Sequence, residues 1–230
     1  MGRPARDADF FRVWTPDMAY VLGYWWADGY MRIRPHGAHD IEIASLDCEH
    51  LLMMANKIGG NFYWRKVRAG SECYEAIFCS VEMYRDIERL GGTPRKSRTM
   101  QMPIVPTHLL VDFVREFVDG DGTLSWNAGK PILQIYSASD QFLVDLGREI
   151  EMATGIPAPN LAKNRANWYL KWSTIRAQCL AAWLYVDNAG LALERKSTVA
   201  DMFLQWKPKK KPQVGTITDG MRRNFPAYIP

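Results

Sequence analysis

The chain has 230 residues, of which 47% are hydrophobic and 12% aromatic, so it can bury a core and is not disordered throughout. Its formal net charge of +4 and its pI near 8.8 permit a nucleic-acid partner without requiring one. The four cysteines have neither CxxC spacing nor a matching histidine cluster, which argues against a zinc site and favours reduced thiols in an intracellular, soluble protein.

The first predicted element is a buried helix. Thr15 can cap it, Pro16 suits its first position, and residues 18–27 are apolar nearly all round. This apolar run is too short to span a bilayer, and the N-terminal ten residues contain no apolar signal region, so we expect no membrane association. The helix ends at Asp28-Gly29, where the chain becomes extended.

Two hairpins and two helices follow in alternation. Runs that alternate polar and apolar residues between turn residues predict the hairpins, and Asp47 can cap the first of the two helices. The predicted ranges are strands 30–34 and 40–44, a helix from Asp47 to Gly59-Gly60, strands 61–68 and 73–79, and a helix over 81–90 that stops at Gly91-Gly92.

The same order of elements is predicted a second time. A helix over 107–119 runs into Gly120-Asp121-Gly122, and each copy ends in the tripeptide Arg-Lys-Ser, at 95–97 and 195–197. We therefore predict an α+β protein with an N-terminal half at 1–95 and a C-terminal half at 96–206. The remaining ranges are strands 123–126 and 132–137, a helix from Ser139 to about Gly155, strands 161–165 and 168–173, and a helix over 175–185.

The last segment, 207–230, differs in composition from the two halves. It opens with the sequence KPKKKP, which cannot pack into a core. We expect a flexible basic arm that contacts phosphates without sequence specificity.

Two nonamers at the ends of the two long helices carry a family resemblance. Residues 21–29 read VLGYWWADG, and residues 114–122 read VREFVDGDG. They resemble the motifs of LAGLIDADG homing endonucleases, in the single-chain form that carries two motifs, and the likeness covers about residues 17–202. The resemblance implies two αββαββα halves whose sheets form a saddle over a double-stranded DNA target. It also implies a monomer with no obligate protein partner.

The resemblance also implies the positions of the site. The acidic residue before the last glycine of each motif binds divalent metal in this family, which here means Asp28 and Asp121. A basic residue in the loop after each half's last helix lies near the site, and Lys96 and Lys196 match it best. The third position of the motif is usually glycine. Gly23 fits this pattern in the first copy, but the second copy departs from it with Glu116.

The chemistry of phosphodiester cleavage suits these residue types. Carboxylates that hold Mg²⁺ help to activate water and to neutralise the phosphate, and Mg²⁺ prefers oxygen ligands while it keeps several waters. The helix-end carbonyls of Ala27 and Gly120 are further candidate ligands, and the two lysines can polarise water or offset charge. We expect Mn²⁺ to substitute for Mg²⁺, and Ca²⁺ to bind without supporting cleavage.

The acidic pair has two simpler interpretations. Asp-Gly commonly ends a helix by turn chemistry, and either aspartate alone would favour that interpretation. A calcium loop that starts at Asp119 is excluded, because its sixth position is Leu124 and its twelfth is Lys130. The matched pair at repeat spacing favours a site.

Strand alternation predicts a DNA-binding face. Basic residues two apart project to the same side of a strand. Polar residues that alternate with the apolar Ile41, Ile43, Leu133 and Ile135 project away from the core, where they can contact bases. An ordinary solvated strand face is the alternative for any one of them. The candidate DNA-binding residues are Arg32, Arg34, Glu42, Lys66, Arg68, Gln134, Tyr136, Lys163, Arg165, Tyr169 and Lys171.

The sequence therefore predicts a site-specific endonuclease that hydrolyses both strands of DNA with divalent metal. The alternative is a DNA- or RNA-binding protein of the same fold that does not cut, such as an intron maturase or a regulator. The acidic pair argues for cutting, and Glu116 argues mildly against it. No intein splicing residues frame the chain, which favours a free-standing or intron-encoded protein.

Overall fold

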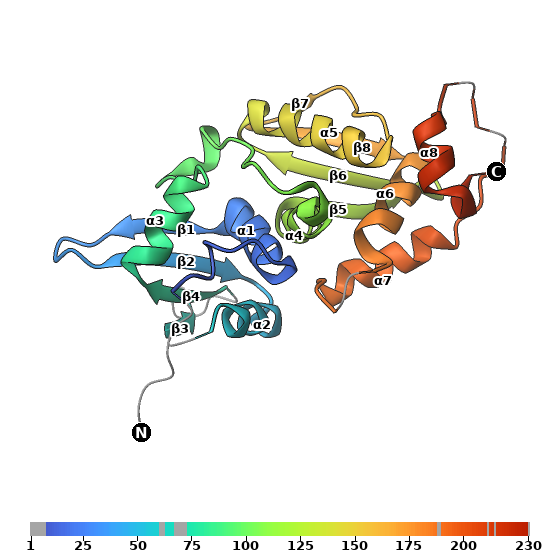
Figure 1. Ribbon diagram of the computed structural model, residues 1–230. Helices are drawn as coiled ribbons and strands as arrows, with labels where there is room; N and C mark the ends of the chain where they lie inside the picture. The colour runs from blue at the N-terminus through green and yellow to red at the C-terminus, as the bar shows by residue number, and fades with distance from the viewer. Residues whose placement is uncertain are drawn as a thin grey trace. The chain divides into compact units, whose positions relative to one another are not determined.

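The computed structural model describes residues 8–59, 63–66, 73–187, 190–210, 212–213 and 215–229 (Figure 1). The chain forms two compact units. The first comprises Met1–Lys96 and Pro103–Gly120, and the second comprises Ser97–Met102 and Asp121–Pro230. Within the described ranges, no helix has the length and apolar character needed to cross a membrane.

The first unit is a four-stranded antiparallel sheet in the order β1-β2-β4-β3, with helices packed on it. Helices α1, α2 and α3 contact strand β2, and α2 also contacts β4. The elements are α1 (Pro16–Asp28), β1 (Tyr30–Ile33), β2 (His39–Ser45), α2 (Cys48–Ile58), β3 (Tyr63–Lys66), β4 (Tyr74–Cys79), α3 (Val81–Arg89) and the short 3-10 helix η1 (Lys96–Arg98), whose last two residues belong to the second unit.

Local sequence explains the helix starts in this unit. Thr15 Oγ1 accepts a hydrogen bond from the Met18 N–H at 3.1 Å, and Asp47 Oδ1 accepts one from the His50 N–H at 3.1 Å. Each cap satisfies a backbone donor that the first turn leaves open, so both predicted starts are confirmed. Gly59 has a φ of 73° beyond the end of α2, a conformation that glycine adopts without strain.

Helix α4 (Leu110–Asp121) follows the 3-10 helix η2 (Thr107–Leu109), and all but its last residue cluster with the first unit. The N-terminal part of the first unit ends at Lys96, close to the boundary that the sequence predicts at residue 95, but Pro103–Gly120, with most of α4, also belongs to this unit. The physical reason is the packing of α4 on α1, which places Phe113 against Gly23. The helix also includes Gly120 and Asp121, and the strand begins directly after them at Gly122.

The second unit repeats the sheet order as β5-β6-β8-β7. Ser139 caps α5 through the Phe142 N–H, as predicted, and the hairpin β5–β6 turns through Ala128 and Gly129, with φ angles of 50° and 70°. Figure 1 shows α5 lying along this sheet, and α5 and α6 both contact β6 and β8. The elements are β5 (Gly122–Asn127), β6 (Lys130–Ser137), α5 (Asp140–Thr154), β7 (Ala162–Asn164), β8 (Asn167–Ser173), α6 (Ile175–Tyr185), α7 (Glu194–Leu204), α8 (Asp219–Asn224) and the 3-10 helix η3 (Pro226–Tyr228).

The predicted alternation of the strands is confirmed in both sheets. Ile41 and Ile43 on β2 and Leu133 and Ile135 on β6 are at most 1% exposed. Glu42, Gln134 and Tyr136, which lie between or beside them, are only partly buried. Each sheet therefore has one face against its helices and one outer face.

The C-terminal segment differs from the flexible arm that its composition predicts. Thr218 caps α8, and its hydroxyl donates to the carbonyl of Gly155 at 2.6 Å, while Asn224 Nδ2 donates to the carbonyl of Thr154 at 2.9 Å. Met221 is fully buried and Phe225 is 6% exposed. Apolar residues four apart put one face of this short helix against α5, so the prediction is wrong for these residues.

Candidate metal and nucleic-acid site

The candidate site begins with the close contact of α1 and α4. A Cβ added at Gly23 would lie 2.2 Å from the carbonyl oxygen of Phe113, so only glycine permits this approach of the two backbones. At the other end of the contact, a Cβ added at Gly120 would lie 2.7 Å from Ala27 Cβ and 3.5 Å from Asp28 Oδ2. Small residues, Ala27 and Gly120, therefore line the contact near Asp28.

Asp28 is the exposed last residue of α1, and its charge acts on two neighbours. Burial raises the pKa of Tyr24 well above its ordinary value, and the negative charges of Asp28 and Glu116 raise it further. Burial and the charge of Asp28 likewise raise the pKa of the Cys73 thiol. Tyr24 therefore stays protonated, and its hydroxyl donates to the carbonyl of Ala44 at 2.7 Å. A cation beside Asp28 would relieve this concentration of negative charge.

Lys96 is almost fully buried next to the first acidic motif, with 6% exposure. Its Nζ donates to the carbonyl oxygen of Gly29, the residue after Asp28, and lies 4.4 Å from the centre of the Trp25 ring. Arg95, with a φ of 59°, precedes Lys96 in a left-handed conformation that is uncommon for a non-glycine residue. A buried lysine is rare, and this one directs its charge to the helix end that carries Asp28.

Lys196 has the same arrangement in the second unit. It is 5% exposed, and its Nζ donates at 2.9 Å to the carbonyl oxygen of Gly122, the residue after Asp121. The lysine lies in the first turn of α7 rather than in the predicted loop, because a helix starts at Glu194. Each lysine of an Arg-Lys-Ser tripeptide therefore bonds the glycine carbonyl that follows the acidic residue of its own motif.

The donor set suits a hard cation. Within the described ranges, no cluster of three His, Cys, Asp or Glu residues could hold a metal ion by itself. Mg²⁺ needs fewer protein ligands, since it keeps several waters and shares substrate phosphate oxygens. Because Gly120 has no side chain, no Cβ crowds the Asp28 carboxylate oxygen from that side. Asp28, Asp121 and the carbonyls of Ala27 and Gly120 remain predicted ligands.

Glu116 has a partner that the sequence did not reveal. Its side chain is fully buried, and its Oε1 lies 2.8 Å from Nε2 of His50, which is 66 residues away on α2. The same His50 nitrogen lies 3.4 Å from the hydroxyl oxygen of Tyr20. Glu116 thus joins α4 to α2. At the contact with Phe113, the close approach of the α1 and α4 backbones depends on Gly23. A buried-looking histidine on α2 was the only available signal.

The outer face of the first sheet pairs most of its charges internally. Arg32 and Arg34 both form ion pairs with Asp40, which is fully buried, and Arg32 also pairs with Glu42 at 2.9 Å. These two arginines share one side, as predicted, but carboxylates of the same sheet already engage them. Lys66 is exposed, with its Nζ 5.5 Å from the Tyr74 ring, and Arg68 lies outside the described residues.

The outer face of the second sheet has a different composition. Gln134 lies directly opposite the exposed Lys171, and Tyr136 lies opposite Tyr169, with ring centres 5.6 Å apart. These four side chains form a polar patch suited to hydrogen bonds with base edges. In the part of the chain that the structure describes, strands β5 to β8 contain no acidic residue.

Two predicted DNA-binding residues do not join this patch. Lys163 lies opposite Trp168, and its Nζ is 4.9 Å from that ring, which puts it on the face of Leu170 and Trp172. Arg165 occupies the turn between β7 and β8, with a φ of 54°. The two-residue spacing was misleading because the strand ends at Asn164.

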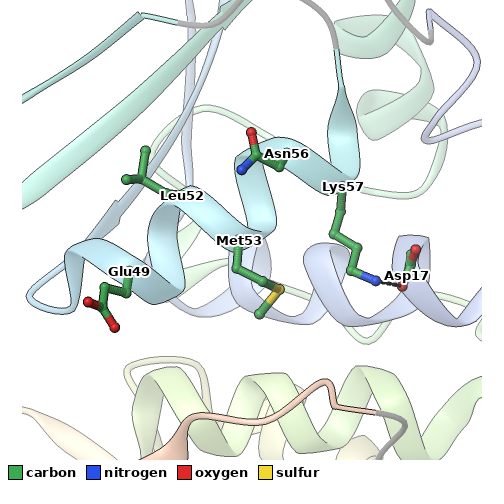
Figure 2. A pocket seen from close by; sticks show the side chains of 6 residues that line it. All are labelled: Asp17, Glu49, Leu52, Met53, Asn56 and Lys57. Atoms are coloured by element: carbon green, nitrogen blue, oxygen red, sulfur yellow. Dashed lines mark hydrogen bonds and ion pairs between the residues drawn. The ribbon is translucent and has the colours of Figure 1, made fainter.

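A separate hollow of about 750 Å³ lies at the opposite end of α1 from Asp28. Figure 2 shows Lys57 of α2 reaching Asp17 of α1, and their ion pair measures 2.8 Å. With two carboxylates and one paired lysine, this hollow does not suit a nucleic acid. Its lining residues are Asp17, Glu49, Leu52, Met53, Asn56 and Lys57.

Solved structures share this fold. I-DmoI in complex with DNA and Ca aligns with a TM-score of 0.59 at 13% identity, over 81% of this chain and 97% of that chain. I-WcaI bound to its DNA recognition sequence aligns with a TM-score of 0.55 at 11% identity, over 87% and 94%. The N-terminal LAGLIDADG domain of DUF199/WhiA aligns with a TM-score of 0.52 at 13% identity, over 84% and 92%.

These likenesses show that the chain has the two-unit LAGLIDADG fold, as its motifs predict. At such identities they show the fold alone. No model of a protein family matches the sequence, and a search of curated proteins finds no match.

Proposed function

We propose that this chain is a site-specific endonuclease that hydrolyses both strands of double-stranded DNA, with Mg²⁺ as its metal ion. The observation that carries the proposal is the matched pair of helix ends. Lys96 bonds the Gly29 carbonyl beside Asp28, and Lys196 bonds the Gly122 carbonyl beside Asp121. A protein that only binds DNA has no need of two buried lysines placed against two acidic helix ends.

The mechanism assigns each residue a separate task. Asp28 and Asp121 would hold the metal, with the carbonyls of Ala27 and Gly120, and bound metal would supply Lewis acidity toward phosphate and water. Lys96 and Lys196 fix the backbone at each helix end and place positive charge where negative charge develops in the transition state. Because the arrangement occurs once in each unit, each unit supplies an acidic residue and a lysine of its own.

The polar patch of Gln134, Tyr136, Tyr169 and Lys171 contributes sequence recognition in this proposal. Glutamine can bond adenine with two hydrogen bonds, and lysine can bond the acceptors of guanine. Complexes of I-DmoI and I-WcaI with DNA support double-stranded DNA as the substrate, and the I-DmoI complexes with Mn and Ca support use of a divalent ion.

The decisive experiment removes one carboxylate charge at a time. We expect Asp28→Asn and Asp121→Asn each to slow double-strand cleavage at least about a hundredfold, with DNA binding retained. Cleavage is measured on a target selected from a random DNA library in Mg²⁺, and binding is measured in Ca²⁺. Asp17→Asn is the matched control, because it removes an exposed carboxylate from the other end of α1.

The outcomes separate the candidate functions. Full cleavage by both variants would contradict the assignment of the two aspartates. Bound but intact DNA with the unmodified protein would instead favour a non-cutting DNA- or RNA-binding protein, the alternative that Glu116 supports by replacing a small residue of the motif.

A further inference from the structure

A second hollow, of about 540 Å³, lies at the β5–β6 turn of the second unit, where the C-terminal segment passes beside the sheet. Within its unit, it is separate from the acidic helix end at Asp121, since it adjoins the far end of β5 from Gly122. Among the described residues, three lysines line it and no carboxylate does. The lining residues are Ala128, Gly129, Lys130, Thr174, Ile175, Trp206, Pro208, Lys209, Lys210, Pro212, Gln213 and Thr216.

Hydrogen bonds on both sides hold the segment that forms this hollow. Trp206 Nε1 donates to the carbonyl of Gly129 in the β5–β6 turn at 2.9 Å. Arg176 of α6 donates from Nε to the carbonyl of Thr216 at 2.9 Å, and from Nη2 to that of Gly215 at 3.0 Å. Lys209 and Lys210 therefore have a defined position beside the turn, which a freely moving basic arm would not give them.

Lys130 connects this hollow with the polar patch on the outer face of the second sheet. Lys130 is the first residue of β6 and has the same orientation as Gln134 and Tyr136, because side chains alternate along a strand. Lys130 and Gln134 are four positions apart, which corresponds to about 13 Å along the strand. A duplex that contacts Gln134 and extends along β6 would bring its backbone to Lys130.

We propose that Lys130, Lys209 and Lys210 bind backbone phosphates of the DNA at the end of the sheet, as a preformed anion site. The inference rests on the proposed function in that it takes double-stranded DNA as the ligand. Ammonium groups in a hollow without carboxylates attract phosphate strongly, and such contacts carry no sequence information. The site fixes the position of the duplex on the polar patch without selecting its bases.

The test measures affinity for the target duplex as a function of KCl concentration, in Ca²⁺. We expect Lys209→Ala combined with Lys210→Ala to weaken binding about tenfold near 0.1 M salt, and to lower the slope of log affinity against log salt by about one to two. Lys130→Ala should lower it by about one. Preference for the target over a scrambled duplex should stay unchanged.

Lys207→Ala is the matched control, because this lysine lies in the same basic run but does not line the hollow. We expect it to change affinity less than twofold. Trp206→Phe keeps an aromatic ring but removes the N–H that bonds Gly129, and we expect about threefold weaker binding with no change in charge. Equal losses from Lys207→Ala and Lys209→Ala would overturn the proposal, since they would indicate a mobile arm.

Two further measurements distinguish this proposal from the endonuclease activity and from other anions. The lysine variants should cleave at the unmodified rate when DNA saturates them. If the unmodified protein does not cut but the salt slopes still fall as stated, the phosphate site stands and the endonuclease proposal fails. Saturable micromolar binding of pyrophosphate without DNA would overturn DNA as the ligand.

Discussion

The two units share one order of strands but place their charges differently. In the first unit, Arg32 and Arg34 pair with the buried Asp40, and His50 lies against the buried Glu116. In the second unit, Lys130 and Lys171 are exposed on strands that contain no carboxylate among the residues described.

This difference shows how one fold divides its tasks. Charges paired inside a protein have already exchanged water for a partner, so they offer little to an incoming ligand. Exposed lysines next to Gln134 still have water to release and bonds to form. We therefore expect the second sheet to provide most of the DNA affinity, although both units carry the same acidic helix end.

The largest effect that would sharpen the comparison concerns stability. We expect His50→Ala to lower the free energy of unfolding by about 3 kcal/mol, because it removes a partner of a fully buried carboxylate. Urea unfolding measures the change. Replacing Glu116 in the same protein, as His50→Ala with Glu116→Leu, should recover part of the loss, since the stranded charge is then gone. A loss below about 1 kcal/mol in His50→Ala would contradict an internally paired first unit.

A smaller expected effect is the difference in DNA affinity that substitutions on the two outer faces produce. We expect Lys171→Ala to weaken target binding about tenfold, whereas Arg32→Ala should weaken it less than threefold. The physical reason is that Arg32 already pairs with Asp40 and Glu42. Affinity is measured by titration of a labelled duplex at fixed salt. The reverse ranking would break the comparison.

The smallest effect is a pH dependence in the first sheet. Burial raises the pKa of Glu42 above its ordinary value of 4.5, although Arg32 acts to lower it. The folded protein therefore keeps the Glu42 proton at pH values where the unfolded chain has lost it. The free energy of unfolding should therefore fall as the pH rises from 4.5 through the raised pKa. It should rise again as the pH falls through the same range.

Glu42→Gln removes this titration and should flatten that part of the profile, by less than about 1 kcal/mol. The unfolding midpoint in urea, measured between about pH 4 and pH 7, checks the change. Gln134→Glu on β6 serves as the counterpart, because it puts a carboxylate on the face that has none. An unaltered profile in Glu42→Gln would contradict the expected shift.

Much of the fold could be predicted because its signals are local. Thr15, Asp47 and Ser139 cap helices where the sequence predicts, and the alternation of Ile41 and Ile43 correctly assigns the two faces of β2. Caps and alternation depend on residues within a few positions of each other. The repeat of the two motifs in turn predicted the two-unit fold, which the comparisons show.

The features that the sequence did not predict depend on contacts between residues that are far apart in the chain. No local pattern joins Glu116 to His50 or Thr218 to Gly155. The basic run at 207–212 looked like a free arm because composition cannot reveal that Trp206 bonds Gly129, 77 residues away. The predicted metal ligands and lysines stay predictions about chemistry, although each lysine lies beside its own motif.

The division of the chain has a consequence for synthesis on the ribosome. The first unit needs α4 through Gly120, because Gly23 packs against Phe113, so it cannot complete when residue 96 emerges. By then residues 97–102 are already made, yet they belong to the second unit, where the Met100 carbonyl accepts a hydrogen bond from Ser139. A nascent chain therefore completes its first unit while residues 97–102 still lack the rest of the second unit, with which they pack.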